Sequence, residues 1–271
     1  MKRIIPALSI LILLSLSLRS QNEVDALRYS RTTFGGSARV MAMGGAYGSL
    51  GADFSTLSTN PAGIGLFKKS EFLFSPSIYI GATNSTYNGT KRDDSKQNFN
   101  MSNAGFVMTT KSGNENAALR YYHFGFGINR LKDFNNRVKI EGVNGENSIT
   151  DVWVDYANGI YYADIEDDIY GDYSFDLHPA WMTYLLDTIP GSLDQYYGAA
   201  EGGPVLQKKY ITSWGSMNEM VISGGANISD RIYFGGTIGI PFIRYFEESN
   251  YGEIDEDNNF NNFQSLNVYQ Y

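Results

Sequence analysis

Cysteine is absent from this chain of 271 residues, and histidine occurs only as His123 and His178. The absence of cysteine excludes disulfides, thiolate metal sites, a cysteine nucleophile and a lipid-anchoring cysteine after a leader. Two histidines leave little material for histidine-based catalysis or metal binding. No nucleophile elbow, zinc-protease motif, P-loop or dinucleotide-binding fingerprint occurs either. The sequence therefore predicts that the protein is not an enzyme, with no catalytic residues, no metal site and no cofactor.

Charged residues are also scarce, at 18% of the chain, and the formal net charge is −8. Without the first 20 residues the balance becomes 18 basic residues against 29 acidic ones. An acidic chain lacks the basic surface that nucleic-acid binding needs, so no nucleic-acid partner is expected. Beyond those 20 residues, no run approaches the ~18 consecutive apolar residues of a membrane-spanning helix.

Residues 1–20 have the pattern of a secretory signal peptide. Lys2 and Arg3 are followed by an apolar stretch from Ile4 to Leu18, and Ser20 offers a small residue at a cleavage point. The mature chain is then expected to begin at Gln21. An uncleaved transmembrane anchor is the alternative, which the short apolar span disfavours.

Aromatic residues and glycine are abundant, with Tyr 20, Phe 16 and Gly 29, a composition that favours β structure. Apolar residues alternate with polar or glycine residues, which predicts half-buried strands. Tyr122, Phe124 and Phe126, for example, alternate with His123 and Gly125. The predicted strands span 71–83, 98–110, 119–132, 214–228 and 231–247, and a further strand begins at 266.

The predicted connections alternate in length. Long charged loops follow the first, third and fifth strands, including a polar loop from Asn84 to Gln97, and short turns follow the others. This pattern is typical of an outer-membrane β-barrel, although a secreted soluble sandwich also alternates. The non-apolar faces carry Gly, Tyr, Asn and Thr, which suits a lumen better than a soluble surface. We expect His123, Tyr79 and Tyr233 to face that lumen.

The stretch 34–67 is dense in glycine and alanine and follows no clean period, which predicts a compact, irregular plug. It ends in the turn sequence Asn60-Pro61-Ala62-Gly63. Residues 134–212 form an expected insertion that is acidic in the middle, with helical patterns at 151–169 and 179–187. Its acidic cluster from Asp164 to Asp168 is either a Ca²⁺ site or, by the simpler interpretation, a solvated loop.

A hydrophobic set in this insertion predicts a surface that captures apolar ligands, or else packing of the insertion onto its own strands. The set consists of Trp181, Tyr184, Leu185 and Leu186.

The order of signal peptide, small-residue segment, Asn-Pro-Ala and first strand resembles the long-chain fatty-acid outer-membrane transport proteins. This FadL/TodX-like family includes Bacteroidetes versions often labelled hemin receptor. Gly44-Gly45-Ala46, Asp53 and Asn60-Pro61-Ala62 match its hatch pattern. The resemblance covers residues 21–133, and the remainder by architecture only.

The resemblance implies a 14-stranded barrel with an N-terminal hatch, in the outer membrane of a Gram-negative cell. Hydrophobic molecules such as long-chain fatty acids would enter by diffusion, so the implied partners are outer-membrane lipid and an apolar ligand. The implied hatch and gating residues are Gly45, Asp53, Asn60, Pro61, Ala62 and Gly63. The alternative is a surface binding protein or haem receptor that acts through its extracellular loops, and His123 or a nearby tyrosine is a conceivable haem ligand.

The predicted organisation has five parts. They are a signal peptide at 1–20, a hatch at 21–68, barrel strands one to three at 69–133, an extracellular insertion at 134–212 and strands four to six at 213–271. Single-chain barrels have at least about eight strands, so a C-terminally truncated chain is expected.

Overall fold

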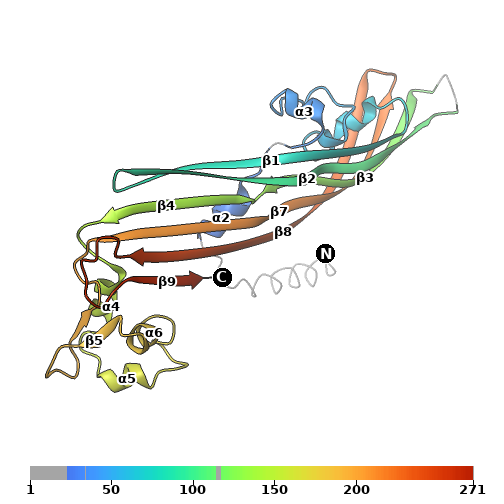
Figure 1. Ribbon diagram of the computed structural model, residues 1–271. Helices are drawn as coiled ribbons and strands as arrows, with labels where there is room; N and C mark the ends of the chain where they lie inside the picture. Colours follow the sequence, from blue (N-terminus) through green and yellow to red (C-terminus); the bar gives the residue numbers. More distant parts are fainter. Residues whose placement is uncertain (1–22, 34, 114–116, 271) are drawn as a thin grey trace, which may run out of the picture. The chain divides into compact units, whose positions relative to one another are not determined.

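The computed structural model describes residues 23–33, 35–113 and 117–270 (Figure 1). The predicted signal peptide lies outside the described residues. A seven-stranded sheet dominates the chain, with the order β1-β2-β3-β7-β8-β9, and β4 also pairs with β7. Its chain-adjacent pairs β2–β3 and β8–β9 are antiparallel, and the prediction of a mostly antiparallel all-β chain is confirmed.

The strands of this sheet are β1 (Glu71–Tyr87), β2 (Thr90–Lys111), β3 (Leu119–Asp133), β4 (Asn136–Asn144), β7 (Val205–Ile228), β8 (Ile232–Ile254) and β9 (Ser265–Gln270). A separate two-stranded sheet joins β5 (Leu186–Thr188) to β6 (Tyr196–Gly198). In the β2–β3 register Gly105 lies opposite Gly127, and Phe106 lies opposite Phe126. Glycines and aromatic rings therefore occupy opposite faces of this strand pair.

Two strands continue through the residues that were predicted as the polar loop Asn84–Gln97. β1 and β2 are joined by a two-residue turn at Asn88-Gly89, where φ is 44° and 77°. Asn-Gly is the preferred sequence of a tight hairpin turn with two positive φ angles. The backbone hydrogen bonds between β1 and β2 form whether or not the side chains are apolar. The two strands therefore extend beyond the residues whose hydrophobic alternation predicts a strand.

The insertion predicted at 134–212 also contains strand. β4 pairs with the first part of β7, from Asn136 opposite Ser213 to Asn144 opposite Val205. The remainder holds the helices α4 (Ile149–Ala157), α5 (Tyr162–Glu166) and α6 (Leu177–Met182). The helix predicted over 151–169 is thus two helices, separated at Gly159, whose φ of 92° is incompatible with a helix.

The chain divides into two compact units. Unit 1 comprises residues up to 76 together with 101–132 and 216–243. Its described residues hold four short helices and the strand segments beside them. The helices are α2 (Glu23–Ser30), α3 (Ala38–Ala42), η2 (Phe54–Ser58) and η3 (Pro61–Leu66). Its buried core joins Phe54, Leu57, Ile64 and Phe67 to Val107 and Val221.

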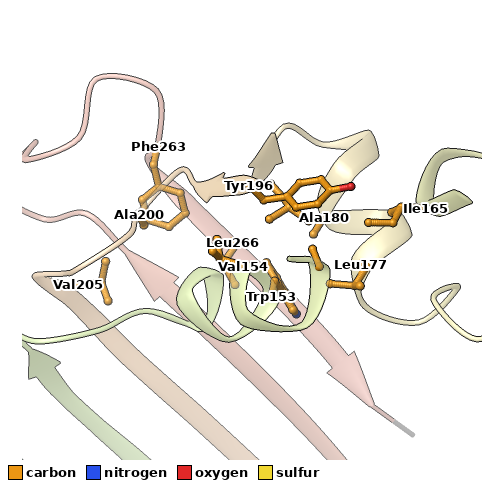
Figure 2. Close-up of a cluster of buried hydrophobic side chains, with 12 residues drawn as sticks. Trp153, Val154, Ile165, Leu177, Ala180, Tyr196, Ala200, Val205, Phe263 and Leu266 are labelled. Atoms are coloured by element: carbon orange, nitrogen blue, oxygen red, sulfur yellow. The ribbon is translucent and has the colours of Figure 1, made fainter. Parts of the chain in front are cut away.

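Unit 2 comprises residues 77–100, 133–215 and 244–271. Its core gathers side chains from α4, α5, α6 and β6 with Phe263 and Leu266 near β9 (Figure 2). Trp153 and Val154 come from α4 (Figure 2). In the described part of the chain, no helix is both long enough and apolar enough to cross a bilayer.

Candidate functional site

The plug in unit 1, residues 35–67, is held together by side-chain caps. Ser37 begins α3, and its Oγ accepts a hydrogen bond from the Val40 N–H at 3.4 Å. Asp53 begins η2, and its Oδ1 accepts from the Ser55 N–H at 2.9 Å. The Ser37 hydroxyl then donates to Asp53 Oδ2 at 2.6 Å. The buried Asp53 therefore joins two pieces of the plug and satisfies helix-end donors that would otherwise lack partners.

The predicted turn at Asn60 ties a later piece of the plug to an earlier one. The Asn60 side chain makes no helix cap, and its Nδ2 donates instead to the Gly48 carbonyl at 2.7 Å. Nearby, the Ala52 N–H donates to the Gly63 carbonyl at 3.1 Å. A Cβ at Gly51 would come within 2.9 Å of Gly63 Cα, so this backbone approach needs glycine.

The plug lies on a glycine-rich face of the sheet in unit 1, which we call the glycine face. Phe54 lies over Gly105 and Gly127, because a Cβ at either position would reach its ring. A Cβ at Gly125 would lie 3.0 Å from Leu57 Cδ1. On β7 and β8, the same face has Gly225 under Ile64 and Gly235 under the backbone of Pro61 and Ala62. The missing Cβ atoms leave the space into which the plug's large residues fit.

Polar contacts add to this packing. Asn103 Nδ2 donates to Ser55 Oγ at 2.7 Å, and Asn129 Nδ2 donates to Ser58 Oγ at 2.7 Å. The Ser58 hydroxyl donates to Glu219 on β7. Plug hydroxyls therefore bridge to side chains of three different strands.

The predicted lumenal residues occupy this side of their strands. His123 on β3 is buried with the same parity as Gly125, and its Nδ1 lies 3.1 Å from Thr109 Oγ1. Tyr233 lies beside the plug, since its ring is 3.0 Å from a Cβ built at Gly65. Tyr79 on β1 shares the parity of Leu73, which packs against the plug core.

The opposite side of the unit 1 strands exposes apolar side chains, and we call it the apolar face. Phe106 packs against Phe124 and Phe126, with ring centroids 6.3 and 6.2 Å apart. Its exposed members are Phe72, Phe74, Phe106, Met108, Tyr122, Phe124, Phe126, Phe234, Ile238, Ile240 and Phe242. The sheet in unit 1 is therefore two-sided, with a plug on glycine and polar residues and uncovered apolar residues opposite.

A cavity of about 410 Å³, with polar side chains and the apolar Val40 and Leu131 in its lining, lies between the plug and the strands of unit 1. Its lining includes Gly45, Tyr47 and Ser58 from the plug, together with Asn129 from β3 and Glu219 from β7. Of the predicted gating residues, Gly45 borders this cavity, whereas Asp53 is enclosed within the plug. The space beside the plug is thus lined by groups that hydrogen-bond water.

Three of the predicted capture residues, Trp181, Tyr184 and Leu186, line one small cavity, and Leu185 lies apart from them. Leu186 is fully buried in the core, whereas Tyr184 is 80% exposed. Trp181 stacks on Tyr162 with ring centroids 5.9 Å apart. Leu185 borders a different space, an apolar groove of about 580 Å³ between α4, α6 and β9.

The sequence did not predict this apolar groove. Its lining includes Ile149, Trp153, Phe175, Pro179, Leu185 and Val268. These residues come from separate segments, so only the pairing of β9 with β8 and the packing of the helices bring them together. No pattern within a single segment of the sequence predicts such a groove.

The acidic stretch is organised by turns. Asp168 Oδ2 accepts from the Tyr173 N–H at 2.6 Å. Within the described residues, no group of three or more His, Asp or Glu side chains is arranged to hold a metal ion.

The Tyr196 hydroxyl lies close to this stretch. Burial raises the pKa of Tyr196 to about 12, and the negative charges of Asp194 and Asp164 act in the same direction. Its hydroxyl therefore stays protonated and donates to the Ile160 carbonyl at 2.8 Å.

Comparisons with protein-family models, with curated proteins and with solved structures find no match for this chain. The family resemblance stated from the residues therefore stays a prediction.

Proposed function

We propose that this chain forms wall and plug of an outer-membrane channel that takes up hydrophobic small molecules, such as long-chain fatty acids, by diffusion. The observation that carries the proposal is the two-sided sheet of unit 1. A barrel wall needs an apolar side toward lipid and a side that faces a lumen, on alternate residues of every strand. Phe106 beside Gly105 and Phe126 beside Gly127 have this alternation.

Strand length supports the same assignment. A tilted strand needs about 9–11 residues to cross the hydrocarbon layer. β2, β3, β7 and β8 have 22, 15, 24 and 23 residues, so each is long enough to cross that layer and extend beyond it. We place the membrane crossing in unit 1, because the apolar face lies there. The finer fold proposed is the 14-stranded barrel that the sequence resemblance implies.

The plug is the proposed gate. It rests on the strands through Phe54, Leu57 and Ile64, and a cavity already separates part of it from them. The hydrogen bond from Ser58 to Glu219 joins it to β7, and the one from Asn60 to Gly48 joins two of its own segments. Sliding of so small an element is a hinge-or-shear motion that opens a path along the wall.

The apolar groove in unit 2 is the proposed capture site. Its volume of about 580 Å³ lies within the ~300–1,000 Å³ typical of ligand pockets. Trp153, Phe175 and Leu185 give it an apolar lining that suits a hydrocarbon chain and discriminates weakly among such chains.

A second candidate is a surface binding protein or haem receptor, which the exposed aromatic side chains of the insertion favour. Tyr170 is 96% exposed and Phe175 is 93% exposed. Titration of the purified chain with haemin distinguishes the haem version, because saturable binding shifts the Soret band. Absence of a shift removes it.

Membrane insertion is tested by a charge on the apolar face. Phe126→Arg is expected to reduce recovery in the outer-membrane fraction, since Arg near the bilayer midplane costs about 2–4 kcal/mol. Tyr170→Arg in unit 2 is the matched control and should insert like the unchanged protein. Equal recovery of both variants, or a soluble protein without detergent, contradicts the proposal.

Gating is tested by uptake of a fluorescent fatty acid into proteoliposomes. Asn60→Ala and deletion of residues 34–63 are both expected to change the uptake rate, because both loosen the plug. Ser49→Ala, at an exposed plug position, should leave the rate unchanged. Unchanged uptake in the deletion variant would exclude a gating role for the plug.

A further inference from the structure

The insertion carries a large uncompensated negative charge. No Lys or Arg occurs between Lys139 and Lys208, a stretch that contains thirteen Asp and Glu residues. Within the described residues, Glu141 is the member of this set that forms ion pairs, with Arg92 and Lys139. The other carboxylates produce a field that attracts cations over roughly a Debye length, about 8–10 Å in physiological salt.

A small cavity opens into this acidic region. It has a volume of about 200 Å³ and lies beside α5, α6 and β5. Its lining consists of Glu166, Trp181, Met182, Tyr184, Leu186 and Asp187. Two aromatic rings, two apolar side chains and two carboxylates thus share one cavity, without a basic side chain among them.

Of the two aromatic side chains, Trp181 is held in a fixed position. Trp181 stacks on Tyr162, with centroids 5.9 Å apart at 28°. Tyr196 meets the Trp181 ring edge-on at 6.1 Å. Leu186 is fully buried in the core of unit 2 and fixes the chain between Tyr184 and Asp187. The Trp181 ring therefore loses little conformational freedom when a ligand binds.

We propose that this cavity binds a small organic cation that carries a quaternary ammonium group, such as choline. A cation over the face of Trp or Tyr is attracted by the ring quadrupole, and nearby carboxylates add a Coulomb attraction. A primary ammonium requires acceptors for its three N–H donors. Glu166 and Asp187 can accept from such an ammonium, whereas the apolar side chain of Met182 offers no acceptor and suits the methyl groups of a quaternary ammonium.

The acidic surroundings also decide between a free cation and a phosphocholine head group. An attached phosphate would lie in the field of Glu166, Asp187 and the neighbouring carboxylates and be repelled. Choline is therefore expected to bind more tightly than phosphocholine. The site lies within unit 2 and does not depend on the proposed channel function.

Isothermal titration of the full chain tests the proposal, in a maltoside detergent that has no ammonium group and at low salt. Choline should bind saturably. Its neutral isostere 3,3-dimethylbutan-1-ol should bind about tenfold or more weakly, because it lacks the charge that the rings and carboxylates attract. Phosphocholine should also bind more weakly. No saturable choline binding, or equal binding of choline and the alcohol, overturns the proposal, and tighter binding of phosphocholine does so too.

Variants locate the site. Tyr184→Leu should weaken choline binding by about 2- to 30-fold, and the double variant Glu166→Gln, Asp187→Asn should weaken it and reduce its salt dependence. Tyr170→Leu removes an exposed tyrosine outside the cavity and should change nothing. Unchanged affinity in the double variant, or equal losses at Tyr170 and Tyr184, contradicts this location. Fatty-acid uptake should be unaffected throughout, which separates failure here from failure of the channel proposal.

Discussion

The ring of Phe54 occupies the space above Gly105. A Cβ at Gly105 would lie 2.5 Å from Phe54 Cε2, and one at Gly127 would lie 2.5 Å from its Cζ. Phe54 is only 2% exposed in this position. An aromatic side chain of the plug therefore packs onto the surface of β2 and β3, because both strands carry glycine at paired positions.

Gly105→Ala is expected to push Phe54 out of this space. Overpacking of a close contact costs about 1–3 kcal/mol, so the variant should unfold at a lower temperature and its plug should be cleaved faster by protease. Phe54→Leu introduced together with Gly105→Ala should recover part of the loss. Gly236→Ala is the control, because nothing lies within 4 Å of a Cβ there. Equal effects of the two alanine variants would mean that Phe54 does not depend on this space.

Asp53→Ala is expected to loosen the plug without removing any apolar contact. The Ser55 N–H and the Ser37 hydroxyl both lose their buried acceptor. Loss of a helix cap costs about 0.5–2 kcal/mol, and an unpaired buried donor adds about 1–3 kcal/mol. Hydrogen exchange of residues 37–66 should therefore accelerate. Ser49→Ala should leave exchange unchanged, and a protected plug in the Asp53 variant would contradict the capping role.

The strands that carry hydrophobic alternation were predictable from the sequence. Phe106, Phe124 and Phe126 alternate with glycine or polar residues, and the structure pairs them as that period requires. The outer parts of the same strands were missed, since residues 84–97 are polar on both faces. The Asn88-Gly89 dipeptide was the available signal for the hairpin, and its two positive φ angles fit that sequence.

The sequence predicted that the plug is closely packed, but not which residues it contacts. Density of glycine and alanine indicates close packing, but the partner of each residue depends on strands far along the chain. Pro61 meets Gly235, and Ser58 meets Glu219. The capture residues illustrate the same limit, because Leu185 and Leu186 are neighbours in sequence yet border a groove and a buried core respectively.

Glu253 is expected to be among the most sensitive polar positions of unit 2. Its carboxylate is fully buried and accepts hydrogen bonds from Ser148, the Ile149 N–H, Gln207 and Tyr251. It thereby fixes the start of α4 against β8. Glu253→Ala removes the acceptor that these four donors share, of which the Ser148 hydroxyl and the Gln207 amide are buried.

The expected loss for Glu253→Ala is about 3–5 kcal/mol, by analogy with the removal of one partner from a buried charged network. Denaturant unfolding of unit 2, followed by the fluorescence of its tryptophans, measures it. Glu248→Ala on the exposed part of β8 should change stability by less than about 0.5 kcal/mol. A small loss at Glu253 would show that α4 is held by its apolar contacts alone.

The turn after β8 is expected to open in acid. Burial opposes ionisation of Asp255, but hydrogen bonds from the Phe260, Asn259 and Asp257 N–H groups outweigh it and lower the pKa of this carboxyl. A folded-state pKa below the unfolded value of about 3.8 means that the ionised carboxylate stabilises the turn above that pH. The stabilisation is lost as pH falls through the folded pKa.

Asp255→Asn tests this titration. At neutral pH the variant should exchange amide protons faster than the unchanged protein over residues 255–264, because Asn is a weaker acceptor than a carboxylate. The difference should narrow as pH falls below 3.8 and through the lowered pKa of the native carboxyl, where the native side chain also becomes neutral. Glu256→Gln, at an exposed neighbouring position, should follow the unchanged protein at every pH. A constant difference between pH 7 and pH 3 would assign the effect of Asp255→Asn to packing and not to charge.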